Sequence, residues 1–153
     1  MQKSSINLRC SRRGAAIVES TIVLAVCLIL LLGMLELSVA LVQHTVVSET
    51  ARRVARAALI HGAKANATQG HWGPSPLAIT AADSHSAAAA AQVALMTVDP
   101  ADVQLNLTWP DGDNQPDQRV QVTVSYTHVP IVPIPGWYSQ LNLQAVSTMR
   151  IAH

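Results

Sequence analysis

The sequence predicts an α+β protein: a long N-terminal transmembrane and amphipathic helix, then a short helix and a three-stranded antiparallel sheet. Three observations predict this class. Twenty-two of the 28 residues from 15 to 42 are apolar. The following residues repeat their apolar side chains at helical spacing, and the C-terminal third alternates between apolar and polar residues. With 12% charged residues and a net charge of +1, the composition gives no reason to expect a nucleic-acid partner.

Residues 1–14 form a basic leader that contains no acidic residue and four basic ones: Lys3, Arg9, Arg12 and Arg13. A basic leader before an apolar stretch is typical of a targeting signal, and its charges predict a cytoplasmic N-terminus. As a helix, residues 15–42 would be about 42 Å long, which is enough to cross a hydrocarbon layer of about 30 Å. We therefore expect a single-pass protein of the inner membrane whose C-terminal domain is periplasmic or otherwise extracytoplasmic.

Two carboxylates, Glu19 and Glu36, interrupt the apolar stretch. An acidic residue within a span costs on the order of 2.5–3.5 kcal/mol on insertion scales, so its presence indicates a partner or a role. Glu36 is near the outer end and can reach the membrane interface. Glu19 is near the inner end, where it can reach the headgroups or pair with a positive charge.

The stretch from Gly14 to Glu19, with basic residues before it and an apolar helix after it, resembles the processing site of type IV prepilins. In that family a membrane-embedded aspartyl peptidase cuts after the Gly, so the resemblance implies processing between Gly14 and Ala15. The new ammonium group of Ala15 would lie about one helical turn from the Glu19 carboxylate, where the two charges neutralise each other. In an assembly, Glu19 would instead pair with the amine of a neighbouring subunit and set the axial register of the helices.

Three segments are together similar to the TadE-like pseudopilins, minor components of the tight-adherence (Flp) pilus assembly machinery: Arg12–Glu19, Gly33–Leu37 and Glu49–Arg56. The resemblance covers about residues 12–60. Ser20 and Ala25 stand where family members usually carry an aromatic residue and a proline. The resemblance implies a pilin-like fold, a membrane anchor, and partners that include prepilin peptidase and other pilin or pseudopilin subunits. It also implies that Glu19 and Glu36 act in helix register and assembly, in a protein that helps to build a pilus or a related envelope secretion structure.

Residues 43–61 are predicted to extend the helix as an amphipathic segment. Its apolar face would carry Val47, Ala51, Val54, Ala55, Ala58 and Leu59, and its charged face Glu49, Arg52, Arg53 and Arg56. Only the tolerated Gly33 interrupts the pattern between 15 and 61, so one helix of about 70 Å is expected, ending before Gly62.

Residues 62–79 are rich in glycine and proline and are predicted to be a loop. Thr80 and Asp83 have the spacing of a capping box, which predicts an Ala-rich helix from there to about Val98, closed by Asp99-Pro100. The domain outside the membrane would comprise residues 80–153.

Three runs of alternating residues predict the strands: Val103 to Trp109, Val120 to Tyr126, and Leu141 to Met149. Residues 110–118 would connect the first two as a hairpin loop. The second connection, residues 127–140, contains three prolines and cannot pair as a central strand. We expect it to fold over the sheet; a contact surface for a partner is the alternative.

No catalytic, metal or cofactor site is predicted. Asp111, Asp113 and Asp117 lack the EF-hand pattern, since Pro116 and Val122 occupy the places of the required Gly and Glu. The six histidines are scattered, and no Ser/His/Asp signature or phosphate-binding loop is found. We therefore expect a non-enzymatic protein that takes no small-molecule substrate.

Two alternatives to the pseudopilin interpretation remain. In the first, residues 1–40 are a secretory signal peptide with Ser38-Val39-Ala40 as its cleavage site, and the mature chain is a secreted or periplasmic binding protein. In the second, the chain is an envelope protein with an unprocessed signal anchor.

Overall fold

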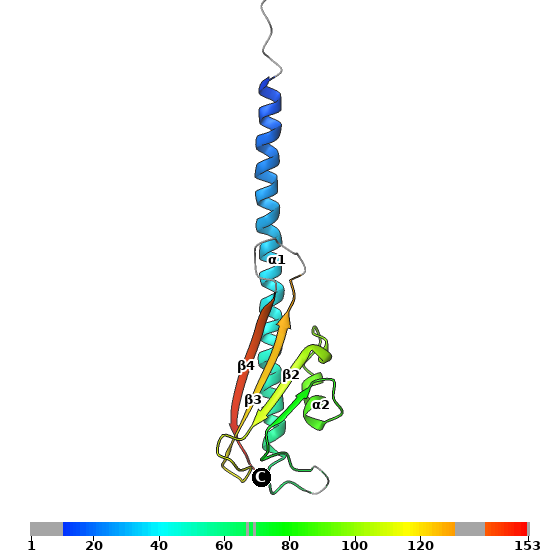
Figure 1. Ribbon diagram of the computed structural model, residues 1–153, viewed down its shortest axis with the longest axis vertical. Helices are drawn as coiled ribbons and strands as arrows, with labels where there is room; N and C mark the ends of the chain where they lie inside the picture. Colours follow the sequence, from blue (N-terminus) through cyan, green and yellow to red (C-terminus); the bar gives the residue numbers. More distant parts are fainter. Residues whose placement is uncertain (1–10, 67, 69, 131–139, 153) are drawn as a thin grey trace, which may run out of the picture. The chain divides into compact units, whose positions relative to one another are not determined.

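A computed structural model describes residues 11–66, 68, 70–130 and 140–152 (Figure 1). Its elements are α1 (Ser11–Leu59), β1 (Leu77–Thr80), α2 (Ser86–Gln92), the 3₁₀ helix η2 (Pro100–Asp102), β2 (Val103–Thr108), β3 (Arg119–His128) and β4 (Leu141–Arg150). The chain divides into two compact units, residues 1–38 and residues 39–153. The α+β class predicted from the sequence is confirmed.

The predicted long helix is confirmed as α1, which continues through Gly33 and ends three residues before Gly62. It begins at Ser11, four residues before the predicted start. Within the second unit, the expected apolar face is buried at Val47, Ala51, Val54, Ala55 and Ala58, and Leu59 is half-buried. The arginines opposite this face are exposed, as their spacing predicts.

The sheet has four strands instead of the predicted three, in the antiparallel order β1-β2-β3-β4. The additional strand, β1, lies at the end of the segment predicted as a loop (62–79). Leu77 pairs with Leu107 and Thr80 with Gln104. Strand β1 is therefore an edge strand of the sheet, with β2 as its neighbour. Its four residues, Leu-Ala-Ile-Thr, are too few and too uniformly apolar to show the alternation that identifies a strand.

The helix predicted from Thr80 to about Val98 is shorter than expected and starts later. The predicted capping contact does form, because the backbone N–H of Thr80 donates to Asp83 Oδ2 at 2.7 Å. It closes the turn after β1 instead of starting a helix. The cap of α2 is His85, whose Nδ1 accepts from the backbone N–H of Ala87 at 3.1 Å.

The three predicted strands are confirmed as β2, β3 and β4. Strand β2 ends at Thr108, one residue before the predicted end, so residues 109–118 connect β2 to β3. In the register, Leu105 lies opposite Val124, and Val124 lies opposite Ala145. Of the connection predicted over residues 127–140, residues 127 and 128 belong to β3. Residues 131–139 lie outside the described part of the chain, so the expectation that the connection folds over the sheet stays a prediction.

Trp72 anchors the loop that follows α1. Its indole stacks on His61 with a centroid distance of 4.1 Å, and its Nε1 donates to Ser86 Oγ at 3.1 Å. The buried Asn114 donates from Nδ2 to the Trp72 carbonyl at 2.7 Å, which joins this loop to the β2–β3 hairpin loop. This loop is thereby fixed to the residue His61 just after α1, to the start of α2 at Ser86 and to the β2–β3 hairpin loop.

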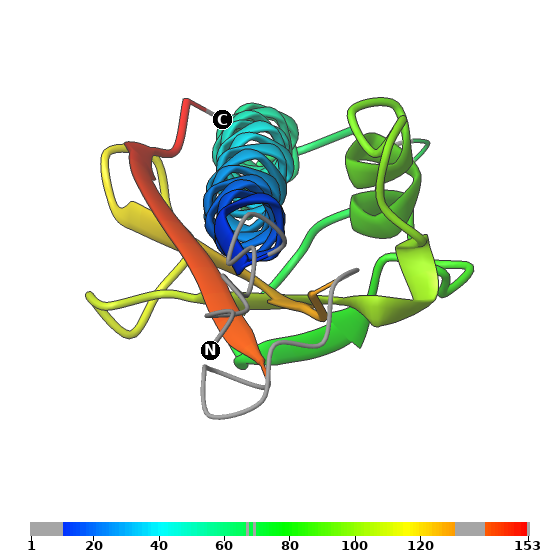
Figure 2. The same cartoon turned by 90° about the horizontal axis from the view of Figure 1, so that it is seen from above.

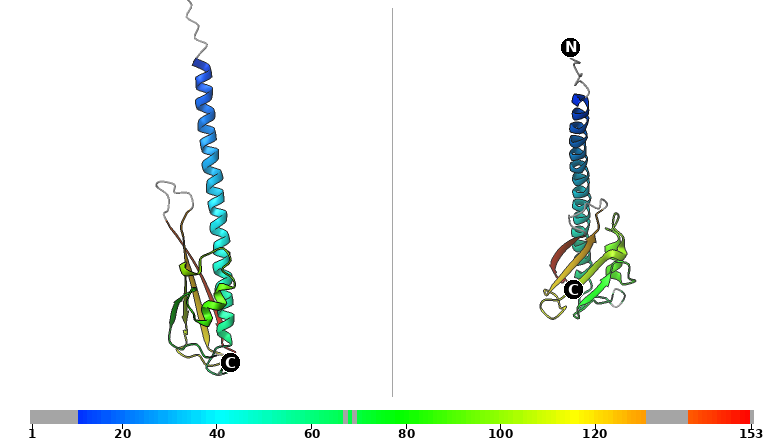
Figure 3. Two further views of the ribbon diagram at one scale, coloured as in Figure 1. Left: turned by 90° about the vertical axis from the view of Figure 1, so that its right-hand side faces the viewer. Right: turned by 45° about the horizontal axis from the view of Figure 1, so that its top comes forward.

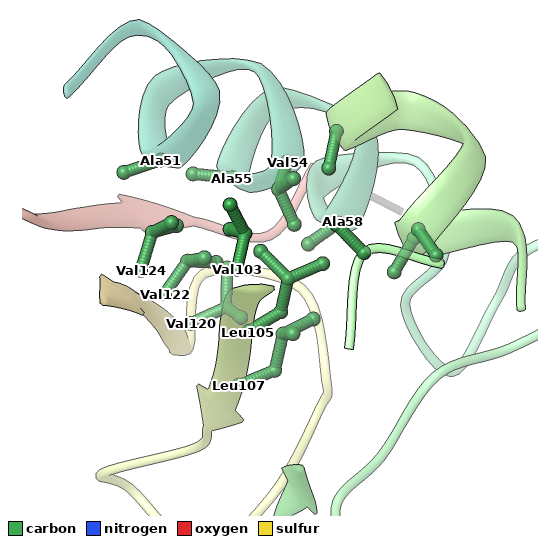
Figure 4. Packing of buried hydrophobic residues seen from close by; sticks show 14 of the residues in the cluster. Ala51, Val54, Ala55, Ala58, Val103, Leu105, Leu107, Val120, Val122 and Val124 are labelled. Atoms are coloured by element: carbon green, nitrogen blue, oxygen red, sulfur yellow. The ribbon is translucent and has the colours of Figure 1, made fainter. Parts of the chain in front are cut away.

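The core of the second unit lies between the sheet and two helices, because α2 and the second half of α1 cover the same face of the sheet (Figure 2). In Figure 4 the α1 side chains Ala51, Val54, Ala55 and Ala58 point toward Val103, Leu105 and Leu107 of β2 and toward Val120, Val122 and Val124 of β3. All ten are at most 4% exposed. Small helix side chains against branched strand side chains allow the helix to pack closely on the sheet.

Strand β3 runs antiparallel to the second half of α1. At one end the Gln43 side chain lies close to Tyr126. At the other end the backbone N–H of Ala152 donates to the Leu59 carbonyl at 3.3 Å, and Ile151 bonds Gln118 next to the start of β3. Sixteen helical residues and seven strand residues both span about 24 Å, so the two elements match in length.

Candidate assembly site on helix α1

The first half of α1 is apolar on every side and exposed. Sixteen large apolar side chains between residues 17 and 42 are between 38% and 66% exposed: Ile17, Val18, Ile22, Val23, Leu24, Val26, Leu28, Ile29, Leu30, Leu31, Leu32, Met34, Leu35, Leu37, Leu41 and Val42. An ordinary surface helix is apolar on one stripe only. A helix of this kind requires lipid or other apolar helices around it.

This helix is long and apolar enough to cross a membrane. Residues 14–59 meet the length and composition of a span, with a mean hydropathy of 2.8 in the most apolar window. Only 6% of that window is buried, which distinguishes it from the core helix of a globular domain. The structure thus contains one N-terminal helix consistent with a single-pass membrane protein (Figure 3).

Glu19 is exposed on this apolar helix. It shares a helix face with Ala16, Ser20, Val23, Leu24 and Cys27. The nearby hydroxyls are satisfied within the helix, since Ser20 and Thr21 both donate to the Ile17 carbonyl, at 2.9 and 2.8 Å. The carboxylate makes no hydrogen bond or ion pair with any side chain that the structure describes. It is therefore available to a positive group from outside the helix.

The predicted processing site lies inside α1. Gly14 and Ala15 are both exposed and both helical. Nothing that the structure describes lies within 4 Å of the position a Gly14 side chain would occupy. A peptidase that cleaves this bond would have to unwind the first turn of α1, which the glycine makes easier because it weakens the helix.

The two carboxylates predicted to act in assembly differ in their exposure. Glu19 is exposed, whereas Glu36 is only 8% exposed. The two residues therefore differ in their access to another subunit. Burial of a carboxylate on an otherwise exposed apolar helix could not be predicted from helical spacing.

A polar group at the end of β3 was not predicted. Tyr126 and His128 are on the strand face turned toward α1, and His128 is 1% exposed. Burial is the main cause that raises the pKa of the Tyr126 hydroxyl, and the charges of Asp102 and Asp99 raise it further; the hydrogen bond from Gln43 opposes this. The signal in the sequence was the alternation of β3, which continues past Val124 through both residues.

Two of the three aspartates of the hairpin loop bind arginines. Asp111 Oδ1 lies 2.6 Å from Arg119 Nη2, and Asp117 Oδ1 lies 3.5 Å from Arg150 Nη1. Asp113 accepts from the backbone N–H of Asn114 at 2.7 Å. Within the described residues, no three His, Cys, Asp or Glu side chains are grouped so that they could hold a metal ion.

These features define a class of protein: an exposed apolar helix with one accessible carboxylate, continuous in sequence with an amphipathic segment that packs on a small antiparallel sheet. The model of one family, described as TadE-like protein, matches residues 14–56. The resemblance predicted from the sequence is thereby confirmed over this segment. The segment contains Gly14, both carboxylates and the start of the sheet-packing face, but no strand. Searches of curated proteins and of solved structures found no match.

Proposed function

We propose that this protein is a membrane-anchored TadE-like pseudopilin, a structural and non-enzymatic component of a pilus or a related envelope assembly machine. The observation that carries the proposal is the exposed apolar helix with Glu19 near its start, inside the segment that matches the family. If similar helices of other subunits packed around the first half of α1, they would bury its sixteen exposed apolar side chains. Its proposed location is the inner membrane, with a cytoplasmic N-terminus and the second unit outside.

Glu19 is proposed to set the register of assembly. Prepilin peptidase would cut between Gly14 and Ala15, and the new ammonium group of one subunit would pair with Glu19 of its neighbour. In an apolar environment an unpaired carboxylate is strongly disfavoured, so only registers that bring the two charges together would be stable.

The mature N-terminus tests the proposal against its two alternatives. N-terminal sequencing or the intact mass should show a chain that starts at Ala15. A chain that starts at Leu41 would instead be a secreted protein, and one that keeps the leader would be an unprocessed anchor.

The role of Glu19 is tested by co-purification with partner pilins. Glu19→Ala should insert into the membrane normally and lose the partners, because insertion does not need the charge and register does. Ser20→Ala is the matched control, since Ser20 is on the same face but bonds only its own helix. Equal recovery of partners with Glu19→Ala and with the wild type would disprove the register role.

A further inference from the structure

The charges of the second unit are segregated along the chain. Residues 65–118 contain six aspartates and no lysine or arginine, whereas residues 39–64 contain four basic residues and one acidic one. Two of the six aspartates, Asp111 and Asp117, pair with Arg119 and Arg150. Apart from Asp113 and Lys64, the remaining charges form two separate exposed groups.

The first group, here called the acidic end, consists of Asp83, Asp99 and Asp102. All three are exposed, at the end of the sheet where β1 ends and β2 begins. Their carboxylates are held in place locally, since Asp99 accepts from the backbone N–H of Ala101 at 2.9 Å and Asp83 from that of Thr80. None of them forms an ion pair with a residue that the structure describes.

The second group, here called the basic stripe, consists of Arg52, Arg53 and Arg56 on the exposed side of α1. These residues are opposite the side that packs on the sheet. Arg53 Nε pairs with Glu49 at 3.0 Å. Arg52 and Arg56, one helical turn apart, make no ion pair in the described part of the chain, so two positive charges remain available.

Within one chain, the acidic end and the basic stripe are too far apart to form ion pairs with each other. Asp102 directly precedes Val103, which pairs with Tyr126 of β3. The start of β3, seven residues before Tyr126, is next to the bonds that Ile151 and Ala152 make with Gln118 and Leu59. The acidic end is therefore about 24 Å from Leu59 along α1, level with Gln43. Arg52 and Arg56 follow 9 and 13 residues later, which places them about 14–20 Å farther along the helix axis. They also point away from the sheet that carries the acidic end.

We propose that the basic stripe of one copy binds the acidic end of a second copy, displaced by about 14–20 Å along α1. The contact is head-to-tail: each copy keeps one free stripe and one free acidic end, so the contact can repeat along a filament. Exposed ion pairs are individually weak and sensitive to salt, so their role is to orient neighbouring subunits. The proposal rests on the pseudopilin function, since the apolar helices must first gather the copies in one membrane.

The test uses the full-length chain in membranes, with a photo-crosslinking amino acid at position 60, where the exposed Ile60 follows Arg56 by one turn, and a mixture of light and ¹⁵N-labelled chains. The cross-link should join one copy to residues 65–119 of another. Trypsin releases this segment as a single peptide, because it has no internal lysine or arginine. Asp99→Asn with Asp102→Asn should lower the yield on the order of tenfold, since two of the three negative charges of the acidic end, and the ion pairs they make, are lost. Asparagine caps a helix as well as aspartate, so η2 is preserved. Asp113→Asn is the matched control and should leave the yield unchanged.

Charge exchange tests the pairing directly. Arg52→Asp with Arg56→Asp should abolish the cross-link, as should Asp99→Lys with Asp102→Lys, and a mixture of the two variants should restore it. Cross-links to lipid or to residues outside 65–119 would overturn the proposal. A cross-link yield that is unchanged after the Asp99 and Asp102 substitutions would also overturn it. A second probe at Val23 separates it from the proposed function. Cross-links between copies at Val23 without any at position 60 reject the charge contact alone, and their absence at both positions rejects helix assembly as well.

Discussion

Gly73 illustrates how a single residue limits the packing of the loop against the sheet. Its φ of +81° is in the left-handed region, and a Cβ at this position would overlap the indole of Trp109. Gly73→Ala should therefore lower the free energy of unfolding by about 2–4 kcal/mol, from backbone strain and from displacement of the ring.

Gly70→Ala is the control, because Gly70 also has a positive φ, +71°, but nothing described lies within 4 Å of its Cβ position. It should cost only about 1 kcal/mol. Chemical denaturation of both variants measures the difference. Equal losses would mean that the Trp109 ring moves aside at no cost.

Asp111 links stability to pH. Hydrogen bonds from the Arg119 side chain and backbone lower the pKa of its carboxyl group from 3.8 to about 2. Because the pKa is lower in the folded state, the stabilisation is fully present above about pH 4 and is lost as the pH falls toward 2. The thermal midpoint of the wild type should exceed that of Asp111→Asn by a constant amount above pH 5, and the two should converge between pH 4 and 2. A gap that persists at pH 2 would contradict the ion-pair explanation.

Helices and strands differ in how far the sequence determines them. Helix α1 and strands β2–β4 could be predicted, since their apolar residues recur at clear periods over many residues. Strand β1 is four residues long and shows no alternation. In α2 the run Ala87–Ala91 has no contrast between faces, so neither its ends nor its buried side can be read from the sequence.

The same limit applies to the sites. Gly14 and Glu19 could be proposed as a site from the sequence because their relation is one of spacing along a single helix. The acidic end could not, because Asp83 and Asp102 come together only through the pairing of β1 with β2. The burial of Glu36 likewise depends on tertiary structure that a helical period does not encode.

Helix α2 permits a direct test of which alanines carry the packing. Ala88 is fully buried and Ala89 is exposed, although both belong to the same alanine run. Ala88→Leu should destabilise the protein by about 1–3 kcal/mol, because three extra carbons must enter a packed core. Ala89→Leu should change the free energy of unfolding by no more than about 0.5 kcal/mol. Denaturant midpoints compare the two, and a larger loss at Ala89 would mean that the other side of α2 packs on the sheet.

At the scale of the whole molecule, the two compact units depend on different environments. Every member of the hydrophobic core lies between residues 47 and 151, so the core takes nothing from residues 1–38. The first unit, in contrast, exposes apolar side chains that only lipid or other helices can cover. The stability of the second unit should therefore not depend on the membrane.

A chain shortened to begin at Val39 tests this separation. It keeps the sheet, α2 and the 21 residues of α1 from Val39 to Leu59, which include all α1 core residues. We expect it to be soluble and to unfold in one cooperative transition, with a far-UV circular dichroism spectrum of mixed helix and strand. Its midpoint should match that of the second unit in the full-length chain in detergent. A shortened chain that begins at Ala51 is the control, because it loses Val47 and the helical turns before it, and it should unfold at a lower temperature. If the Val39 chain showed no cooperative transition, the apolar half of α1 would have to contribute to folding as well as to the proposed membrane anchoring.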